Sequence, residues 1–273
     1  MHPRFAQFPA ALASRCETTR LGPSQVPALL AHPDWEQPAP VVLWMHGRSV
    51  NKELDPGRYL RWIRAGIAAC AVDLPGHGER ADAAMQTSSR SLEVVAQMVG
   101  EIDGIVAALG AEEYKGVFDL SRIGIGGMSA GGMVALRRLC EPHTLACAAV
   151  EGATGDLRGM YLPGTRGLTH SPIASHDPRR VEALDPASHL DRWRPIPLLA
   201  LHSKGDQIVP FQTQLHFIDL LRAHYEQMGA DPTVIELQTW DQTGAPQEHS
   251  GFGRFANDAK NAQTAFFERM LKP

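Results

Sequence analysis

Residues 122–136 read RIGIGGMSAGGMVAL, an apolar strand pattern that passes through small residues into a helical pattern. Within it, residues 127–131 fit G-x-S-x-G, in which glycines allow a tight turn and the hydroxyl of Ser129 would stand above a sheet. The amides that follow would begin a helix, and a helix N-terminus favours negative charge. The five residues alone are equally typical of an inert turn between strand and helix. The choice between a turn and a nucleophile therefore depends on the rest of the chain.

Strand patterns alternate with helical patterns along the chain. Short apolar runs predict buried strands, and apolar residues with a period near 3.6 predict helices. Besides the run before Ser129, the predicted strands cover residues 25–31, 41–45, 67–72, 145–150, 197–202 and 233–240. The predicted helices cover residues 56–65, 91–109, 133–139, 211–228 and 257–271. We predict that residues 25–31 form an edge strand, because Pro27 has no N–H to donate.

This alternation predicts the fold class. Strands that alternate with helices imply right-handed crossovers and a mostly parallel central sheet with helices on both faces. We therefore expect an α/β protein in which residues 1–273 form a single domain. Residues 155–194 lose the alternation and are rich in Pro, His, Asp and Arg. They predict a short cap insertion with short helices.

Composition and charge limit the kinds of partner and the cellular location that we expect. Lys and Arg number 26 and Asp and Glu number 30, and a net charge of −4 argues against a general nucleic-acid binder. No apolar stretch approaches the ~20 residues of a membrane span, and the first residues do not fit a signal peptide. We expect no nucleic-acid partner, no membrane association and a cytoplasmic location. The four cysteines lack metal-type spacing and are predicted to be reduced and structural.

The residues just after the predicted strands include a chemically coherent set. Ligands of parallel sheets bind beyond the carboxyl ends of the strands. At those ends stand His46-Gly47-Arg48, Ser129, Asp206 and His249, which supply a serine, an acid and a histidine in that order. A neutral imidazole can take the proton of a serine hydroxyl during attack, and a buried carboxylate can orient that imidazole.

The same chemistry needs donors for a developing oxyanion. Two backbone N–H groups are required, and those of Ala130 and Arg48 are the candidates. Beside this group, the candidate substrate contacts are His46, Met128 and the cap residues Tyr161 and Leu162. His46 is equally interpreted as an organiser of the oxyanion loop, and the cap residues as packing under a loop.

Five motifs in this order resemble those of the alpha/beta-hydrolase superfamily. They are the turn at Ser129, His46-Gly47, DLPGHG at residues 73–78, KGDQIVP at residues 204–210, and Glu248-His249-Ser250. The resemblance covers about residues 41–271 and is strongest to compact esterases related to dienelactone hydrolases and to the prolyl-oligopeptidase catalytic domain. It implies the alpha/beta-hydrolase fold and a triad of Ser129, Asp206 and His249. The chain differs from dienelactone hydrolases in having serine instead of cysteine, and it lacks the propeller of prolyl oligopeptidases.

Some residues leave alternatives open. Glu151 and Asp156 follow an earlier strand and compete with Asp206 for the role of the acid. The guanidinium of Arg48 could bind a substrate carboxylate, or it could bond to nearby loop residues.

No metal or cofactor is expected. Glu53, Asp55, Asp73 and Glu79 are spread over turns without the spacing of metal ligands, and the chain has no G-x-G-x-x-G followed by a ribose-binding acid. The sequence thus predicts a serine hydrolase, most consistent with a carboxylesterase for small or medium esters, and makes no prediction of the oligomeric state. Two alternatives remain: an aminopeptidase or acylpeptide-type hydrolase, and a catalytically silent binding module with a hydrolase fold.

Overall fold

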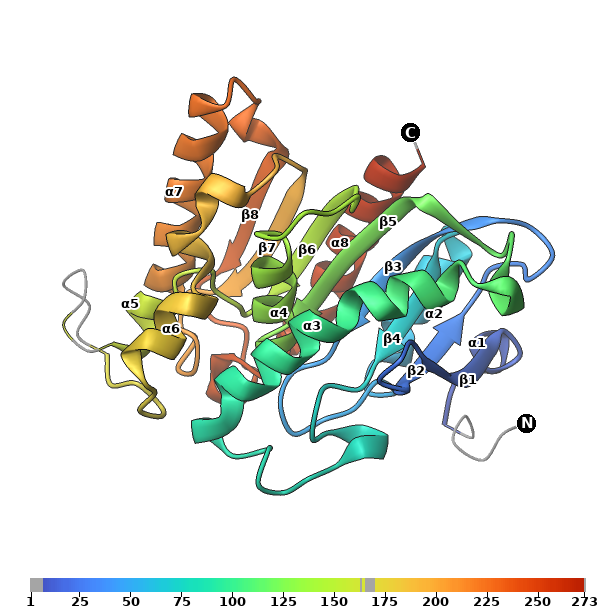
Figure 1. Cartoon of the computed structure of the whole chain (residues 1–273), viewed down its shortest axis with the longest axis horizontal. Coiled ribbons are helices and arrows are strands. Elements are labelled where there is room, and N and C mark those ends of the chain that lie inside the picture. The colour runs from blue at the N-terminus through green and yellow to red at the C-terminus, as the bar shows by residue number, and fades with distance from the viewer. Residues whose placement is uncertain (1–6, 163, 165–169, 273) are drawn as a thin grey trace.

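The computed structural model describes residues 7–162, 164 and 170–272. Its centre is an eight-stranded sheet in the order β1-β2-β4-β3-β5-β6-β7-β8 (Figure 1). The strands are β1 (Cys16–Leu21), β2 (Val26–Ala31), β3 (Ala39–Met45), β4 (Ala68–Val72), β5 (Phe118–Met128), β6 (Cys147–Glu151), β7 (Leu198–Ser203) and β8 (Ile235–Trp240). Strands β3 to β8 are parallel, whereas β1 and β2 run antiparallel to their neighbours.

Helices cover both faces of this sheet. They are α1 (Ala10–Ala13), α2 (Pro56–Arg64), α3 (Ser91–Leu109), α4 (Ala130–Arg138), α5 (Leu157–Tyr161), α6 (Pro178–Leu184), α7 (Phe211–Gln227) and α8 (Ala256–Leu271). One apolar core joins the sheet to α3, α4 and α7, and a second joins it to α1, α2 and α8. In Figure 1, α3 and α4 lie in front of the sheet and α8 lies behind it. The predicted α/β class with a mostly parallel sheet is confirmed.

Alternation of side chains explains why both faces are apolar. In β3, Val41, Leu43 and Met45 belong to the core under α3 and α4, while Val42 and Trp44 belong to the core under α2 and α8. Successive side chains of a strand point to opposite faces, so a strand between two helical layers must be apolar at every position. This is why the central strands read as continuous apolar runs.

The N-terminal edge of the sheet differs from the prediction. The sequence pattern missed β1, and β2 is therefore not an edge strand, because it lies between β1 and β4. Pro27 is accommodated for a local reason: its carbonyl accepts the N–H of Asp73 at 3.0 Å, just beyond the paired residues of β2 and β4. The N–H that Pro27 lacks points to the same side, so it falls at the end of that ladder and costs no interior hydrogen bond.

Helix α4 also begins earlier than predicted. The apolar period starts at Met133, but the helix starts at Ala130, directly after Ser129. The glycines at 131 and 132 carry no side chain that could show a helical period. The early start places the free amides of the first turn next to Ser129.

Within residues 155–194, the described residues (155–162, 164 and 170–194) pack over the α3 and α4 side of the sheet. Besides α5 and α6, they form short 3₁₀ helices at Pro186–Ser188 and Leu190–Arg192. Leu157, Val181 and Trp193 are buried in the same core as α3 and α4. This segment is thus anchored to the body of the sheet by apolar side chains.

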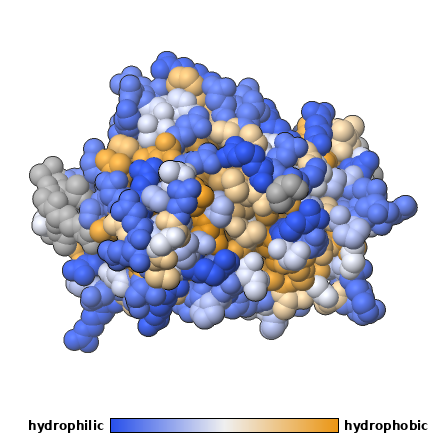
Figure 2. All heavy atoms as spheres, turned by 90° about the horizontal axis from the view of Figure 1, so that it is seen from above, coloured by the Kyte–Doolittle hydropathy of each residue, from blue (hydrophilic) through white to orange (hydrophobic). Residues whose placement is uncertain are grey.

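The face of the molecule seen in Figure 2 is mostly hydrophilic. Figure 2 shows the molecule from above the view of Figure 1, with hydrophilic residues over much of the face and hydrophobic ones gathered toward its middle. Among the described residues, no helix combines the length and the apolar character that crossing a membrane requires.

Candidate active site

Ser129 lies on a strained turn between β5 and α4. Its φ of 52° and ψ of −117° are unfavourable for a residue with a side chain, so the surroundings must hold it there. Its N–H donates to the Glu151 carbonyl at 2.8 Å, which ties the turn to β6. The flanking glycines are required by contact: a Cβ on Gly127 would overlap the backbone of Gly131, and one on Gly131 would overlap the Met45 carbonyl. The serine therefore sits where the G-x-S-x-G pattern predicts a nucleophile turn.

A chain of hydrogen bonds links Ser129, His249 and Asp206. The Ser129 Oγ lies 2.9 Å from Nε2 of His249, and Nδ1 of His249 lies 2.8 Å from Oδ2 of Asp206. The three residues follow β5, β8 and β7, so the carboxyl ends of three strands bring them together. Gly152, after β6, lies beside the pair and has a φ of 50°, a backbone conformation that favours glycine.

Asp206 is held as a carboxylate. Burial raises its pKa, but hydrogen bonds from His202 and His249 outweigh that effect, and the pKa of Asp206 is lowered from its usual value. Its Oδ1 accepts the N–H groups of Ile208 and Val209, both at 2.8 Å. These two backbone bonds fix the carboxylate so that its other oxygen faces His249.

The two competing acids have other partners. The carboxylate of Glu151 forms a bidentate pair with Arg58, with both N–O distances at 2.9 Å. Asp156 caps the N-terminus of α5 by accepting the N–H of Gly159 and lies 3.1 Å from Nδ1 of His216. Asp206 is thus the acid that contacts His249.

The two candidate oxyanion donors belong to segments next to Ser129. Ala130 is the first residue of α4, so its N–H has no acceptor within the helix. Gly47, which precedes Arg48, packs against the turn, and a Cβ on Gly47 would lie 3.6 Å from Cβ of Ser129. The guanidinium of Arg48 donates to the Gln86 carbonyl at 3.2 Å and to the Ser88 Oγ at 3.3 Å, so it is bonded to nearby loop residues.

Ser129 and His249 open into a cavity of about 640 Å³. His46 and Met128 line it, as the sequence predicts for substrate contacts, but Tyr161 and Leu162 are not among its lining residues. The Tyr161 hydroxyl lies 3.3 Å from the Ser91 Oγ. The ring of His46 is buried, and its Nδ1 donates to the Gly47 carbonyl while its Nε2 accepts the N–H of Leu74. These contacts fit the organising role better than a substrate contact.

Lys52, which sequence reasoning missed, lies among the carboxylates that were weighed as metal ligands. Its Nζ is fully buried and lies 2.9 Å from Asp73, 2.7 Å from Glu79 and 3.0 Å from Glu53. The ammonium therefore pairs with all three carboxylates and balances one of their three charges. Within the described part of the chain, no cluster of three or more His, Cys, Asp or Glu side chains is arranged to hold a metal ion. The only signal in the sequence is a lysine beside Glu53, which is too common to be informative.

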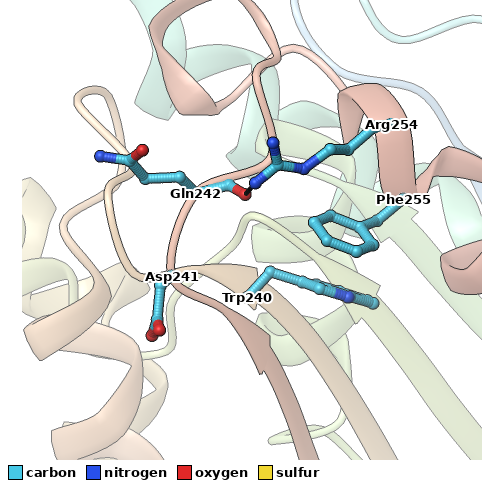
Figure 3. Close-up of a pocket in the computed structure, with 5 residues that line it drawn as sticks. All are labelled: Trp240, Asp241, Gln242, Arg254 and Phe255. Atoms are coloured by element: carbon cyan, nitrogen blue, oxygen red, sulfur yellow. Dashed lines mark hydrogen bonds between the residues drawn. The ribbon is translucent and has the colours of Figure 1, made fainter.

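The loop that carries His249 is closed at its base. Trp240, the last residue of β8, stacks on Phe255 with ring centroids 5.9 Å apart, and Arg254 donates to the Gln242 carbonyl at 2.9 Å. Figure 3 shows these side chains around a shallow pocket, with the guanidinium of Arg254 on the side of the Phe255 ring away from Trp240. The side chains of Asp241 and Gln242 point away from the stacked rings. The contacts hold the two ends of the loop together.

Residues 58–273 match the prolyl oligopeptidase family. The chain belongs to this family. It is 24% identical to the esterase YjfP of Escherichia coli over 209 residues, which cover 70% of this chain and 79% of that protein. The alpha/beta-hydrolase superfamily and the serine hydrolase class predicted from the motifs are thereby confirmed.

Solved structures show the same fold. TT1662 from Thermus thermophilus superposes with a TM-score of 0.68 at 22% identity and covers 95% of this chain and 99% of its own. An acylaminoacyl peptidase from Pyrococcus horikoshii gives a TM-score of 0.68 at 21% identity and covers 94% of this chain, but only 42% of the peptidase is matched. The chain is therefore similar to a part of that larger protein.

Proposed function

We propose that this serine hydrolase of the prolyl oligopeptidase family is a carboxylesterase that cleaves small or medium carboxylic esters. Ser129 is the nucleophile, His249 the general base and Asp206 the group that orients His249. The observation that carries the proposal is the unbroken chain of hydrogen bonds from Ser129 Oγ through both nitrogens of His249 to Asp206. Such a chain activates a hydroxyl that is a poor nucleophile by itself.

In the first half of the reaction, Ser129 Oγ attacks the ester carbonyl carbon while Nε2 of His249 takes its proton. The charge that develops on the carbonyl oxygen is stabilised by the N–H groups of Ala130 and Arg48. The bond to the alcohol oxygen then breaks, and His249 returns its proton to the departing alcohol. The acid remains covalently bound to Ser129 as an acyl-enzyme.

In the second half, water attacks the acyl carbon and His249 Nε2 accepts a proton from the water. The bond to Ser129 Oγ breaks, His249 protonates that oxygen, and the carboxylic acid leaves. Throughout, Asp206 accepts the N–H at Nδ1 of His249, which keeps Nε2 available as the base and stabilises the imidazolium that forms.

Similarity to an esterase favours an ester as the substrate, whereas the family and the peptidase structure favour an amide. We rank the ester first because 79% of the esterase is matched by this chain, whereas only 42% of the peptidase is matched. Turnover of aminoacyl amides well above that of esters would reverse the ranking.

The test is Ser129→Ala, assayed with p-nitrophenyl acetate and butyrate. Turnover should fall by about three orders of magnitude or more, because the acyl-enzyme cannot form. Ser24→Ala is the matched control, since Ser24 lies exposed in the turn before β2. A fluorophosphonate should label the wild type and the control but not Ser129→Ala. Lack of labelling of the folded wild type would favour the silent binding module instead.

A further inference from the structure

Three neighbouring strand ends build one wall of the cavity beside Ser129. Trp44 of β3, Met128 of β5 and Glu151 of β6 all line this cavity. Met128 is paired with Glu151 in the sheet, and the N–H of Ser129 donates to the Glu151 carbonyl. The Glu151 side chain points to the α2 and α8 side, since it contacts Arg58 of α2 and Gln263 of α8. The wall next to Ser129 therefore contains a buried charge.

This charge is neutralised by a rigid set of contacts. Arg58 holds both oxygens of Glu151 at 2.9 Å and lies 4.2 Å from the centre of the Trp44 ring. Gln263 donates to Glu151 at 2.8 Å. Gly126 makes room for the ring, because a Cβ there would lie 2.8 Å from a Trp44 ring carbon. Arg58 and Glu151 are each at least nine-tenths buried, so the pair is a fixed, neutral part of the wall.

A second, more accessible ion pair lies on the same cavity. Lys260 Nζ lies 2.9 Å from Oδ1 of Asp55, and the side chain of each is 22% exposed. Asp55 also accepts from Arg58 at 3.1 Å, which links the two pairs. Lys260 has three N–H donors, of which Asp55 occupies one. A group that enters the cavity there meets an ammonium and a carboxylate side by side.

Such a pair discriminates between kinds of ligand. A hydrocarbon chain would displace water from both charged groups without replacing its hydrogen bonds, which is costly. A ligand with a full charge would be attracted by one member of the pair and repelled by the other. A hydroxyl group can donate to the carboxylate and accept from the ammonium at once.

We propose that Asp55 and Lys260, backed by Arg58 and Glu151, form a polar subsite that selects esters bearing a hydroxyl group on either the acyl or the alcohol side. The inference rests on the proposed ester hydrolysis at Ser129 and names the substrate class for that site. Short hydroxylated esters are preferred over plain alkyl esters of the same length, and activity falls as the acyl chain lengthens.

Three butyrate-length esters test this in a pH-stat assay: ethyl butyrate, ethyl 3-hydroxybutyrate and glyceryl monobutyrate. At least one hydroxylated ester should show a kcat/KM about tenfold above that of ethyl butyrate, the gain of about one hydrogen bond to a charged group. Whichever of the two hydroxylated esters has the higher kcat/KM shows whether the acyl side or the alcohol side of the ester lies at the subsite. A kcat/KM for ethyl butyrate equal to or above both would overturn the proposal.

Lys260→Met should remove most of this preference, and Asp55→Asn should reduce it. Lys115→Met is the matched control, because Lys115 is exposed and pairs with Glu112 on the surface. Urea unfolding of each variant separates a loss of preference from a loss of fold. Unchanged ratios in both folded variants would overturn the subsite while leaving the esterase intact. Failure of the esterase itself would appear as a lack of Ser129-dependent turnover of all three esters.

Discussion

The carboxylate of Glu248 accepts a hydrogen bond from the Ser203 hydroxyl at 2.7 Å, and this bond ties the loop of His249 to the end of β7. Ser203 is three residues before Asp206, so the bond joins the two segments that must meet in the triad. Glu248 also accepts the N–H groups of Thr243 at 2.6 Å and Gly244 at 2.7 Å. Gln247 and Glu248 both have positive φ values, 55° and 52°, which these bonds help to maintain.

Replacing Glu248 with Gln should therefore lower kcat by about tenfold to a hundredfold with a smaller change in KM. An amide cannot accept all of these hydrogen bonds, and a misplaced His249 impairs proton transfer more than binding. Steady-state kinetics measure the split between the two constants. Glu112→Gln, at an exposed helix position, is the control. A lower free energy of unfolding and a higher KM, with kcat unchanged, would show that Glu248 has only a structural role.

Stability should depend on the protonation of Glu248. Its backbone and side-chain hydrogen bonds lower the pKa of Glu248 to about 2, against about 4.3 in an unfolded chain. Because the folded pKa is depressed, the stabilisation is complete above about pH 4.3 and is lost as the pH falls through about 2. The difference in free energy of unfolding between wild type and Glu248→Gln should thus shrink between about pH 4.3 and 2. Urea unfolding across this range checks it, and a constant difference would contradict it.

Lys52→Met should destabilise the fold by about 3–5 kcal/mol, because it leaves the fully buried carboxylate of Asp73 without the ammonium that it faces. Lys52 lies in the segment that follows His46 and Arg48, and its backbone N–H also donates to Asp73 at 3.0 Å. Urea unfolding measures the loss. Lys115→Met should change stability by less than about 0.5 kcal/mol, as a surface substitution does. If the two variants lower the free energy of unfolding by similar amounts, the carboxylates around Lys52 must become hydrated or protonated when the ammonium is removed.

Chelation should not affect turnover. The Lys52 ammonium lies where a cation bound by Asp73, Glu79 and Glu53 would have to lie. Dialysis against EDTA, followed by assay with p-nitrophenyl butyrate, should leave kcat/KM unchanged. Loss of activity that added divalent metal restores would refute this prediction.

Gly131→Ala should abolish activity and destabilise the protein by about 1–3 kcal/mol, because its methyl group would overlap the carbonyls of Met45 and His46. Gly100→Ala is the same substitution in α3, where an added Cβ meets nothing within 4 Å. It should be neutral or stabilise by up to about 1 kcal/mol, since alanine favours a helix. Esterase assays and urea unfolding of both variants provide the comparison. Normal activity in Gly131→Ala would show that the Ser129 turn can shift without harm.

The sequence alone determined the alternation of the central strands and helices along the chain and the turn at Ser129. Apolar periodicity and glycine positions are local properties, so they predicted α3 at residues 91–109 and the strand that enters the turn. The edge strand β1 was not predicted, because its residues are mostly half-buried and show no clear apolar pattern.

Only the tertiary structure decided which carboxylate contacts His249. Glu151, Asp156 and Asp206 all follow strands, and a strand end says where a side chain emerges but not what it meets. Glu151 is excluded by Arg58, which is 93 residues away, and Asp206 is selected by a contact across 43 residues. The Asp55–Lys260 pair, which joins the residue before α2 to α8, is likewise a contact between distant parts of the sequence that only the tertiary structure shows. Such contacts depend on the order of the strands in the sheet, because that order sets which loops lie side by side.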